Sequence, residues 1–531
     1  MAPDPSGAIG ALLRRSRLRR PPLFLLAPAL IGAAVAIAPI WYLVDRALTQ
    51  GWDEVVAEIW QRRTLDLVLR SLGLAATVTV ASVVVGVCAA WLVVRSDLPG
   101  RNLLRVLLAL PLAVPSYLSA FAWVSWKPWL AGFRGAALVL TLVSYPFVYL
   151  PAVAALRHLD PAQEEVARSL GRSRVDVALR LTVRQIRPAI AAGALLVALY
   201  VLSDFGAVAA MRYEVFTWVI YGAYRAGFNP SRAAILALVL VAIAFVLVVA
   251  EARVRGRAAA ARIGSGAART ATQVRLGRAG PLAWAFLVTI LAAGIAFPVI
   301  RVLQWVVTFE STDVDVSDVI GALGQTLVLA ALAALAAIAL AVPVGVLAAR
   351  HRDRASVAIE RSTYVAHTLP GIVVAISLVF VGVRLLRPVY QEIPLLVLGY
   401  VVLFLPLAVG AVRSSVEQSP VRLEEVARSL GSSPQRVLAR VTAPLALPGI
   451  GAGTALVFLT TMKELPVTLV LRPTGTETLA TKLWRYTAVS DYANAGPYAL
   501  ALVLFAAIPT ALLSGALSSR SSRGERDLTD V

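Results

Sequence analysis

The sequence is poor in the residues that cross-link chains, bind metals or carry charge. Its 531 residues include one cysteine, Cys88, and three histidines, and only 15% of them are charged. A single cysteine excludes an intrachain disulfide and a cysteine-based metal cluster. Average globular domains carry about 25% charged residues, whereas 59% of this chain is hydrophobic. The composition therefore predicts a protein whose solvent is lipid.

Catalytic signatures are also missing. The sequence has no G-x-x-x-x-G-K-[ST] phosphate loop, so we do not expect this chain to hydrolyse ATP itself. The histidines, His158, His351 and His367, are scattered, and we find neither zinc-site spacing nor a catalytic triad. We therefore expect no catalytic residue, no metal site and no cofactor in this chain.

Acidic residues are scarce relative to basic ones, and the formal net charge is +20. Such a charge can indicate nucleic-acid binding, but most arginines here flank apolar runs, where they orient a membrane protein. With the N-terminus in the cytoplasm, roughly two thirds of the basic residues fall in cytoplasmic segments. We expect a multi-pass protein of the cell (inner) membrane with both termini cytoplasmic and no nucleic-acid partner.

Twelve apolar stretches are long enough to cross a lipid bilayer, which needs about 20 residues of helix. They lie near 23–45, 68–94, 103–125, 135–156, 189–211, 232–251, 282–304, 321–349, 363–385, 394–412, 447–470 and 495–517. Pro111, Pro115 and Pro370 interrupt the third and ninth stretches, which membrane helices tolerate where neighbours satisfy the freed carbonyls. The predicted fold class is all-α transmembrane.

An internal repeat divides the chain. The octet Glu-Glu-Val-Ala-Arg-Ser-Leu-Gly at 164–171 returns unchanged at 424–431, at an offset of 431 − 171 = 260. Asp204 and Glu464 keep this offset. Arg95 and Arg350 match at an offset of 350 − 95 = 255. Such self-similarity predicts two homologous halves.

Each half contains six of the predicted spans, so the two copies point the same way across the membrane. The first repeat covers 1–251 and the second covers 281–531. Between them, 252–280 is rich in alanine, glycine and arginine and is predicted to be a cytoplasmic linker. The architecture expected is two parallel six-helix repeats rather than an inverted pair.

Each octet lies in a long loop that the topology places in the cytoplasm, at about 157–187 and 414–446. Asp160-Pro161 and Ser419-Pro420 are predicted to begin short helices, as cap and first-turn residues. Gly171 and Gly431 are predicted to turn the chain, and Ser173 and Ser433 to cap a second helix. These residues at helix starts and turns are Asp160, Pro161, Ser419, Pro420, Gly171, Gly431, Ser173 and Ser433.

The octets present apolar residues on one helix face. Val166 and Leu170 are four residues apart, and their counterparts Val426 and Leu430 have the same spacing. One such helix alone would favour an amphipathic element lying on the membrane. Two near-identical copies in symmetric loops favour a pair of docking helices for two equal partners.

The octets resemble the EAA loop of ABC importer permeases. Glu165, Ala167 and Gly171 match that motif, and so do Glu425, Ala427 and Gly431, whereas Val166 and Val426 replace its first alanine. The second copy keeps the downstream proline of the family as Pro444, while the first has Arg184 there. The docking residues that the resemblance implies, with their neighbours, are Glu164, Glu165, Ala167, Leu170, Gly171, Glu424, Glu425, Ala427, Leu430 and Gly431.

The resemblance implies a type I ABC importer permease (MetI-like) fold. It also implies two ABC ATPase subunits that bind ATP and Mg and seat on the EAA loops, and an extracytoplasmic binding protein that delivers the substrate. Two rival classes remain. A gradient-driven secondary transporter would need no duplicated cytoplasmic socket, and a membrane scaffold or sensor would transport nothing and use its octets only for assembly.

Two longer segments narrow the resemblance to one group of importer permeases. Residues 202–208 (Leu-Ser-Asp-Phe-Gly-Ala-Val) and 463–473 (Lys-Glu-Leu-Pro-Val-Thr-Leu-Val-Leu-Arg-Pro) resemble the fused twelve-span permeases of ferric-iron importers. Ferric iron is therefore the expected substrate, with thiamine, phosphonate or another small solute as alternatives, because permeases for these share the fused architecture. We expect a separate binding protein, not this chain, to hold the iron tightly.

Three ionisable residues lie in the predicted fifth spans of the two halves, one in the first half and two in the second. Asp204, Lys463 and Glu464 are candidates for the translocation path or its gate, because charges inside a membrane are costly. The alternative is a structural salt bridge of Lys463 with either carboxylate. The outer loops carry aromatic residues that could dock a binding protein or form the interfacial aromatic belt. These are Trp218, Tyr221, Tyr224, Trp484, Tyr486 and Tyr492.

Overall fold

The structure, a computed structural model, is built almost entirely of helices. It describes residues 21–49, 51–157, 159, 161–173, 176–225, 229–258, 273–308, 315–351, 353–366 and 368–507. Within these ranges the only β structure is an isolated parallel bridge between Ser96 and Val274. The predicted all-α fold class is confirmed.

Nine helical segments among the described residues are long and apolar enough to cross a membrane. They are Leu23–Leu48, Arg62–Arg95, Phe133–Arg157, Arg180–Ser203, Pro230–Ala250, Gly277–Thr308, Val316–Arg350, Ile393–Gln418 and Pro434–Met462. Two further segments qualify as bent pairs of helices, and a shorter apolar helix covers Tyr492–Ala507. These segments follow the twelve predicted stretches in order, and residues 508–517 of the last prediction lie outside the described part.

The two bent pairs are the third and ninth predicted spans. Arg101–Ala113 and Ser116–Trp126 meet at 87°, and Arg354–Ala366 and Gly371–Arg384 meet at 106°. Pro115 directly precedes α6 (Ser116–Trp126), and Pro370 directly precedes α19 (Gly371–Arg384). Proline lacks a backbone N–H and its ring clashes with the preceding turn, so the helix breaks there. The predicted interruptions are confirmed.

The predicted fifth and eleventh spans, 189–211 and 447–470, are not continuous helices, which corrects that prediction. Each ends at an ionisable residue, Asp204 or Lys463, and a short helix follows after the break. The four pieces are α11 (Val183–Ser203), α12 (Gly206–Ala210), α23 (Ala443–Met462) and α24 (Pro466–Leu471). The break has a local cause, a carboxylate that caps the second piece, described below.

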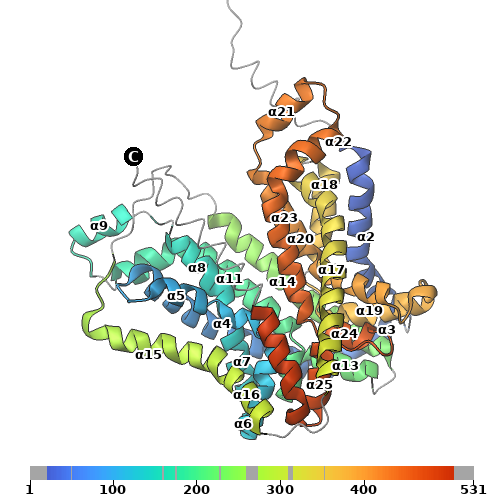
Figure 1. Cartoon of the computed structure of the whole chain (residues 1–531), viewed down its shortest axis with the longest axis horizontal. Helices are drawn as coiled ribbons and strands as arrows, with labels where there is room; N and C mark the ends of the chain where they lie inside the picture. Colours follow the sequence, from blue (N-terminus) through green and yellow to red (C-terminus); the bar gives the residue numbers. More distant parts are fainter. Residues whose placement is uncertain are drawn as a thin grey trace, which may run out of the picture. The chain divides into compact units, whose positions relative to one another are not determined.

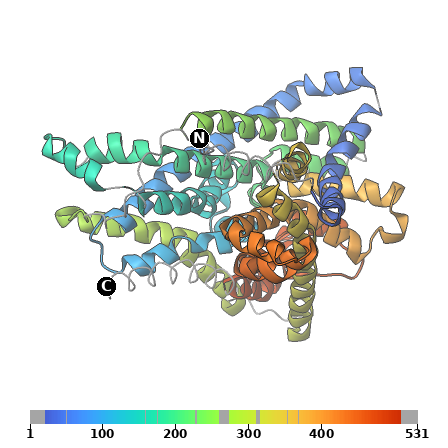
Figure 2. The same cartoon turned by 90° about the horizontal axis from the view of Figure 1, so that it is seen from above.

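The helices form two compact units. Unit 1 comprises Met1–Arg46 with Ile320–Thr478, and unit 2 comprises Ala47–Val319 with Leu479–Val531. The first predicted span, α2 (Leu23–Leu48), therefore packs mainly with helices of the second repeat. In both views α2 lies beside the helices of unit 1 (Figures 1 and 2). This division describes packing, and the repeat boundaries drawn from the sequence stay a prediction.

Small residues bring helices close together in both units. In unit 1, α23 packs against α20 (Ile393–Gln418), and a Cβ on Gly453 would lie 2.6 Å from the Cβ of Ala411. In unit 2, α11 packs against α8 (Pro146–Arg157), and a Cβ on Gly193 would lie 2.7 Å from the carbonyl oxygen of Phe147. The two glycines are matched by the repeat, since 453 − 193 = 260. Small residues at such contacts let backbones approach where lipid gives no hydrophobic drive.

The predicted linker, 252–280, has regular structure at both of its described ends. Helix α14 (Pro230–Ala258) continues into its first residues. At its other end the N–H of Val274 donates to the carbonyl of Arg95 over 2.7 Å, and the N–H of Asp97 donates to the carbonyl of Val274. The segments 259–272 and 309–314 lie outside the described residues.

Candidate functional site

Both octets form short helices that end in the same way. They are α9 (Pro161–Ser169) and α21 (Val421–Ser429). Gly171 and Gly431 follow them with φ of +85° and +81°, a left-handed conformation that glycine adopts without steric cost. In the first copy, the N–H of Gly171 donates to the carbonyl of Arg168 and that of Arg172 to Ala167. This is a Schellman motif, and the predicted turn is confirmed.

The second copy repeats this ending. The N–H of Gly431 donates to the carbonyl of Arg428, and that of Ser432 donates to Ala427, each over 3.0 Å. Ser433 then caps the next helix by accepting from the N–H of Arg436. In the first copy, Ser173 likewise accepts from Asp176. The predicted serine caps are confirmed.

The predicted start of the second octet helix is wrong by one residue. Ser419 does not cap it, because the Ser419 hydroxyl donates back to the carbonyl of Ser415 in the preceding helix. Its carbonyl accepts from the guanidinium of Arg350, which holds the residue in an extended conformation. Pro420 is therefore the cap residue, and α21 begins at Val421. Asp160 lies outside the described residues.

Each octet helix exposes its apolar pair. The exposed fractions are 58% for Val166 and 78% for Leu170, against 55% for Val426 and 80% for Leu430. Glu165 and Glu425 are exposed as well. An isolated exposed leucine needs no explanation, but two equal pairs at repeat-matched positions do. The octets therefore offer two equivalent apolar faces.

The inner side of the first octet helix is held by an ion pair. The Glu164 Oε1 atom lies 3.1 Å from Nη2 of Arg95, the last residue of α4 (Arg62–Arg95). The Thr182 hydroxyl donates to the same oxygen over 2.9 Å. Thr182 ends a π-helical turn, η3 (Val177–Thr182), that leads into α11. One carboxylate thus joins three segments of unit 2.

The second copy has the same arrangement with more hydrogen bonds. Nε of Arg350, the last residue of α17 (Val316–Arg350), donates to Glu424 Oε1 over 2.9 Å. The Thr442 hydroxyl donates to that oxygen over 2.9 Å, and Nη2 of Arg428 donates to Oε2 over 3.0 Å. Thr442 ends the π-helical turn η8 (Leu438–Thr442) before α23. Pro444 of this copy and Arg184 of the first thus follow the same kind of turn.

The sequence contained part of this arrangement. The repeat matched Arg95 with Arg350, but the sequence assigned no role to these arginines. The sequence analysis did not identify Thr182 and Thr442 as functional residues. Their offset, 442 − 182 = 260, equals that of the octets and was the available signal. We call Arg95, Glu164 and Thr182 the first anchor, and Arg350, Glu424 and Thr442 the second anchor.

Asp204 restarts the broken fifth span of the first repeat. Its Oδ1 accepts from the N–H of Ala207 over 2.8 Å, at the first turn of α12. Its Oδ2 accepts from the hydroxyl of Ser116, the first residue of α6, over 2.5 Å. Its carbonyl accepts from the Thr217 hydroxyl over 2.7 Å. The side chain is buried, so these bonds replace the water that a carboxylate requires.

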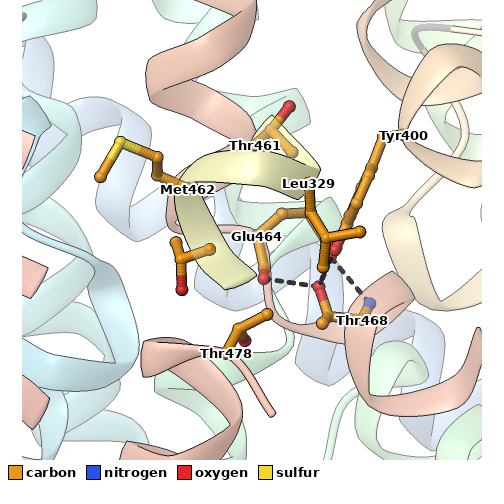
Figure 3. Close-up of a pocket in the computed structure, with 8 residues that line it drawn as sticks. Leu329, Tyr400, Thr461, Met462, Glu464, Thr468 and Thr478 are labelled. Atoms are coloured by element: carbon orange, nitrogen blue, oxygen red, sulfur yellow. Dashed lines mark hydrogen bonds between the residues drawn. The ribbon is translucent and has the colours of Figure 1, made fainter. Parts of the chain in front are cut away.

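Glu464 has the same position in the second repeat. Its two oxygens accept from the N–H groups of Val467 and Thr468, over 2.9 and 3.0 Å, at the first turn of α24. The Thr468 hydroxyl lies 3.0 Å from Glu464 Oε2 and 2.7 Å from the hydroxyl of Tyr400. Figure 3 shows this chain of three side chains. The carboxylate thus sits in a polar, hydroxyl-rich setting.

A narrow recess within unit 1, with almost no room for a water molecule, includes Glu464 in its lining. Its lining, drawn in Figure 3, is Thr326, Leu329, Tyr400, Thr461, Met462, Glu464, Thr468 and Thr478. Four threonines and a tyrosine supply hydroxyl groups that can donate or accept hydrogen bonds. Helix α24 (Pro466–Leu471), which carries Thr468 of this lining, lies toward the end of unit 1 opposite α21 (Figure 1).

In each repeat, the length of the capping carboxylate side chain complements the size of the residue that follows the proline in the broken third span. Ser116 follows Pro115 and meets the shorter Asp204, whereas Gly371 follows Pro370 and lies beside the longer Glu464. A Cβ on Gly371 would be 3.0 Å from Glu464 Oε1. Ser116 and Gly371 are matched by the repeat, since 371 − 116 = 255. In each half, the broken fifth span therefore contacts the broken third span through a carboxylate.

Lys463 is half-buried and directly follows α23. A cation at this position faces the negative end of the helix dipole. Both carboxylates are engaged in capping the helices that follow them, which is a role that the sequence did not suggest. The path and salt-bridge alternatives stay predictions.

The outer-loop aromatic residues pack against other rings within unit 2. Trp484 of α25 (Leu479–Ala488) lies 5.5 Å from Phe205 and 5.6 Å from Phe121, between ring centroids. Tyr492 lies 4.9 Å from Trp305. These contacts make the rings part of the fold and leave both predicted roles, docking and aromatic belt, as predictions. Among the described residues, no group of three acidic, histidine or cysteine side chains could hold a metal ion.

Comparison with known proteins matches two parts of the chain to one family model. Residues 82–257 and 341–519 each match the model described as binding-protein-dependent transport system inner membrane component. Both matches include one octet and one capping carboxylate.

Individual relatives agree with this match. The chain is 35% identical to the Fe(3+)-transport system permease protein FbpB 2 of Haemophilus influenzae, over 93% of this chain and 98% of that protein. It is 26% identical to the sulfate transport system permease protein CysT of Escherichia coli, over 39% of this chain and 82% of the relative. The sulfate transport system permease protein CysW of Synechocystis is 33% identical over 24% of this chain and 51% of its own length.

Proposed function

The chain belongs to the family of binding-protein-dependent transport system inner membrane components, and from this premise we propose that it translocates ferric iron in an ATP-driven importer. Membership makes it a multi-pass permease of the inner membrane. Iron is proposed because the relative whose whole length the chain spans is an Fe(3+)-transport permease, whereas the sulfate permeases match only parts of this chain.

Two ATPase subunits would dock on the two octet helices. The observation that carries this proposal is the equal exposure of Val166 with Leu170 and of Val426 with Leu430, on helices that are tied down from their inner side. Exposed apolar anchors rimmed by charge, here Glu165 or Glu425, are typical of protein interfaces. The partner subunits would bind and hydrolyse ATP with Mg, since this chain has no phosphate loop.

The octets would then face the cytoplasm, with both termini on that side, and a binding protein would deliver iron from the other side. Asp204, Lys463 and Glu464 would lie on the translocation path or act at its gate. This is supported by their position where the fifth spans break, toward the end of the helices away from the octets. Hydroxyl and carboxylate oxygens, as around Glu464, suit a hard cation such as Fe³⁺.

Uptake measurements test the substrate. Cells with and without the chain should differ in uptake of ferric iron and should not differ in uptake of sulfate, thiamine or phosphonate. Unchanged iron uptake with a fall in one of the other solutes would reject iron and keep the importer. Uptake that persists after loss of the ATPase, and depends on an ion gradient, would instead support a secondary transporter.

Co-purification tests the docking. The wild-type chain should retain two ATPase subunits per permease, and Glu425→Lys should release ATPase without lowering expression. Glu417→Lys is the matched control, because Glu417 is another exposed glutamate of unit 1 that lies outside the octet. Equal release by both variants would show that charge reversal acts non-specifically, and it would contradict docking at α21.

A further inference from the structure

The two adjacent glutamates of each octet point in different directions. Glu165 and Glu425 are exposed, whereas the side chain of Glu424 is 3% exposed and that of Glu164 is 22% exposed. Neighbouring residues on a helix are about 100° apart around its axis, so one can face a partner while the other faces the protein. The Glu-Glu pair therefore has an outer and an inner member.

The inner glutamate meets the same two groups in both copies. One is the arginine that ends the second span of its repeat, Arg95 or Arg350. The other is the threonine that ends the π-helical turn before the fifth span, Thr182 or Thr442. Such π-helical turns often mark functional sites in helices. The contacts are thus repeated between matched residues in two separate units.

These contacts are firm for physical reasons. Arg95, Thr182 and Thr442 are almost fully buried, and a buried charge left without its partner is strongly unfavourable. Glu424 accepts hydrogen bonds from a guanidinium and a hydroxyl, and Glu164 accepts from a hydroxyl and forms an ion pair with a guanidinium, so two groups fix the direction of each carboxylate. The octet helix cannot tilt away from its two spans without breaking these bonds.

We propose that Glu164 and Glu424 are positioning residues that transmit movement of each octet helix to the second and fifth spans of its own repeat. Arg95 and Arg350 are the attachment points on the second spans, and Thr182 and Thr442 are those at the fifth. The outer glutamates, Glu165 and Glu425, would contact the ATPase, whereas Glu164 and Glu424, which the resemblance grouped with them for docking, would act behind that contact and not in it. The inference rests on the proposed docking of ATPase subunits to the octets.

Movement that reaches the fifth spans is relevant to transport, because these spans lead to the candidate gate. The helices that begin next to Thr182 and Thr442 end at Ser203 and Met462, directly before Asp204 in the first repeat and two residues before Glu464 in the second. A displacement of the anchor is therefore delivered to one end of a continuous helix whose other end carries the candidate gate. Removing the anchor should leave docking intact and disconnect it from the spans.

The second anchor is the better one to test. Arg350 also donates to the carbonyl of Ser419, and Arg428 supplies a further donor to Glu424. In the first anchor, Nη2 of Arg95 is near enough to Glu164 for an ion pair but is not aligned for a hydrogen bond, and Nε of Arg95 is buried with no hydrogen-bond partner among the described residues. Variants of Glu424 should therefore have larger effects than variants of Glu164.

The experiment compares Glu424→Gln with Glu425→Gln in the full permease–ATPase complex, with Glu417→Gln as control. Each variant is scored for retained ATPase, for ATP hydrolysis and for ferric-iron uptake. Glu424→Gln should keep the ATPase and its hydrolysis within about twofold while uptake falls by about tenfold, within the range of typical coupling energies. Glu425→Gln should lose ATPase, and Glu417→Gln should match the wild type in all three.

Thr442 supplies a second test that does not depend on a charged residue. Thr442→Val keeps the side-chain volume and should lower uptake by severalfold at unchanged ATPase retention, and Thr442→Ser should restore it. Normal uptake in both Glu424→Gln and Thr442→Val would overturn the inference, as would ATPase loss in Glu424→Gln equal to that in Glu425→Gln. A wild-type chain that retains no ATPase would instead contradict the proposed function itself.

Discussion

The two octet regions have the same eight residues but different support. Their outward faces agree closely, with Leu170 and Leu430 exposed to 78% and 80%. Their inner sides differ, because Glu424 is more buried than Glu164 and accepts from more donors. Two equal partners would require the same exposed surface on both octets. The contacts behind each octet could differ, because the rest of the two repeats has diverged.

A second comparison concerns the capping carboxylates. The first repeat pairs a short carboxylate with Ser116, and the second pairs a longer one with Gly371. The volume lost at one residue is gained at the other, so the contact between the broken third and fifth spans is kept in both. The repeats therefore preserve an arrangement rather than a residue type.

Replacing the inner glutamates should give the largest difference in stability loss between the two anchors. Glu424→Ala leaves Arg350 without its carboxylate and should lower the free energy of unfolding by roughly 3–5 kcal/mol. Glu164→Ala removes a more exposed carboxylate and should cost roughly 1–3 kcal/mol. Unfolding of the purified protein in detergent measures both. Equal losses would show that the two anchors contribute alike, against the difference in burial.

Exchanging the residues at the third-span breaks tests the volume match. Gly371→Ser introduces a Cβ that would lie 3.0 Å from Glu464 Oε1, and overpacking of this kind costs about 1–3 kcal/mol. Gly371→Ser combined with Glu464→Asp recreates the first repeat and should recover part of the loss. The apparent unfolding temperature of the single and double variants measures this, and an additive loss in the double variant would contradict the match.

In the second repeat, Glu464, Thr468 and Tyr400 form a chain of polar side chains. The first repeat cannot form the same chain, because Val208 stands at the position matched to Thr468 (468 − 208 = 260). Thr468→Val should leave the buried Tyr400 hydroxyl unsatisfied, at a cost of about 1–3 kcal/mol. Adding Tyr400→Phe should reduce that cost. A double-mutant cycle on the free energy of unfolding measures the coupling, and zero coupling would mean that the chain contributes nothing to stability.

The two helix-ending glycines should show the smallest and most equal effects. Gly171→Ala and Gly431→Ala place a Cβ at a φ of +85° or +81°, and each should cost roughly 1 kcal/mol. Within the described part of the chain, neither glycine has a neighbour within 4 Å of an added Cβ, so the penalty comes from the backbone alone. Unfolding measurements on both variants check this, and a much larger effect in one copy would indicate an additional contact there.

The positions of the spans, their breaks and the octet turns could be predicted from the sequence, because each depends on local chemistry. Apolar length predicted the helices, Pro115 and Pro370 predicted the bends, and Gly171 with Gly431 predicted the chain reversals. The cap at Ser419 was predicted wrongly because a distant guanidinium, that of Arg350, holds the Ser419 carbonyl. A local rule cannot include a partner 69 residues away.

By itself, the sequence determined that this chain is a membrane protein of two parallel repeats with a duplicated octet, since hydropathy and self-similarity are properties of the residues alone. Only the tertiary structure decided which glutamate of each octet faces inward, which arginine and threonine meet it, and that Asp204 and Glu464 cap broken helices. The reason is that buried polar groups must find partners, and those partners come from segments that are far apart in the chain.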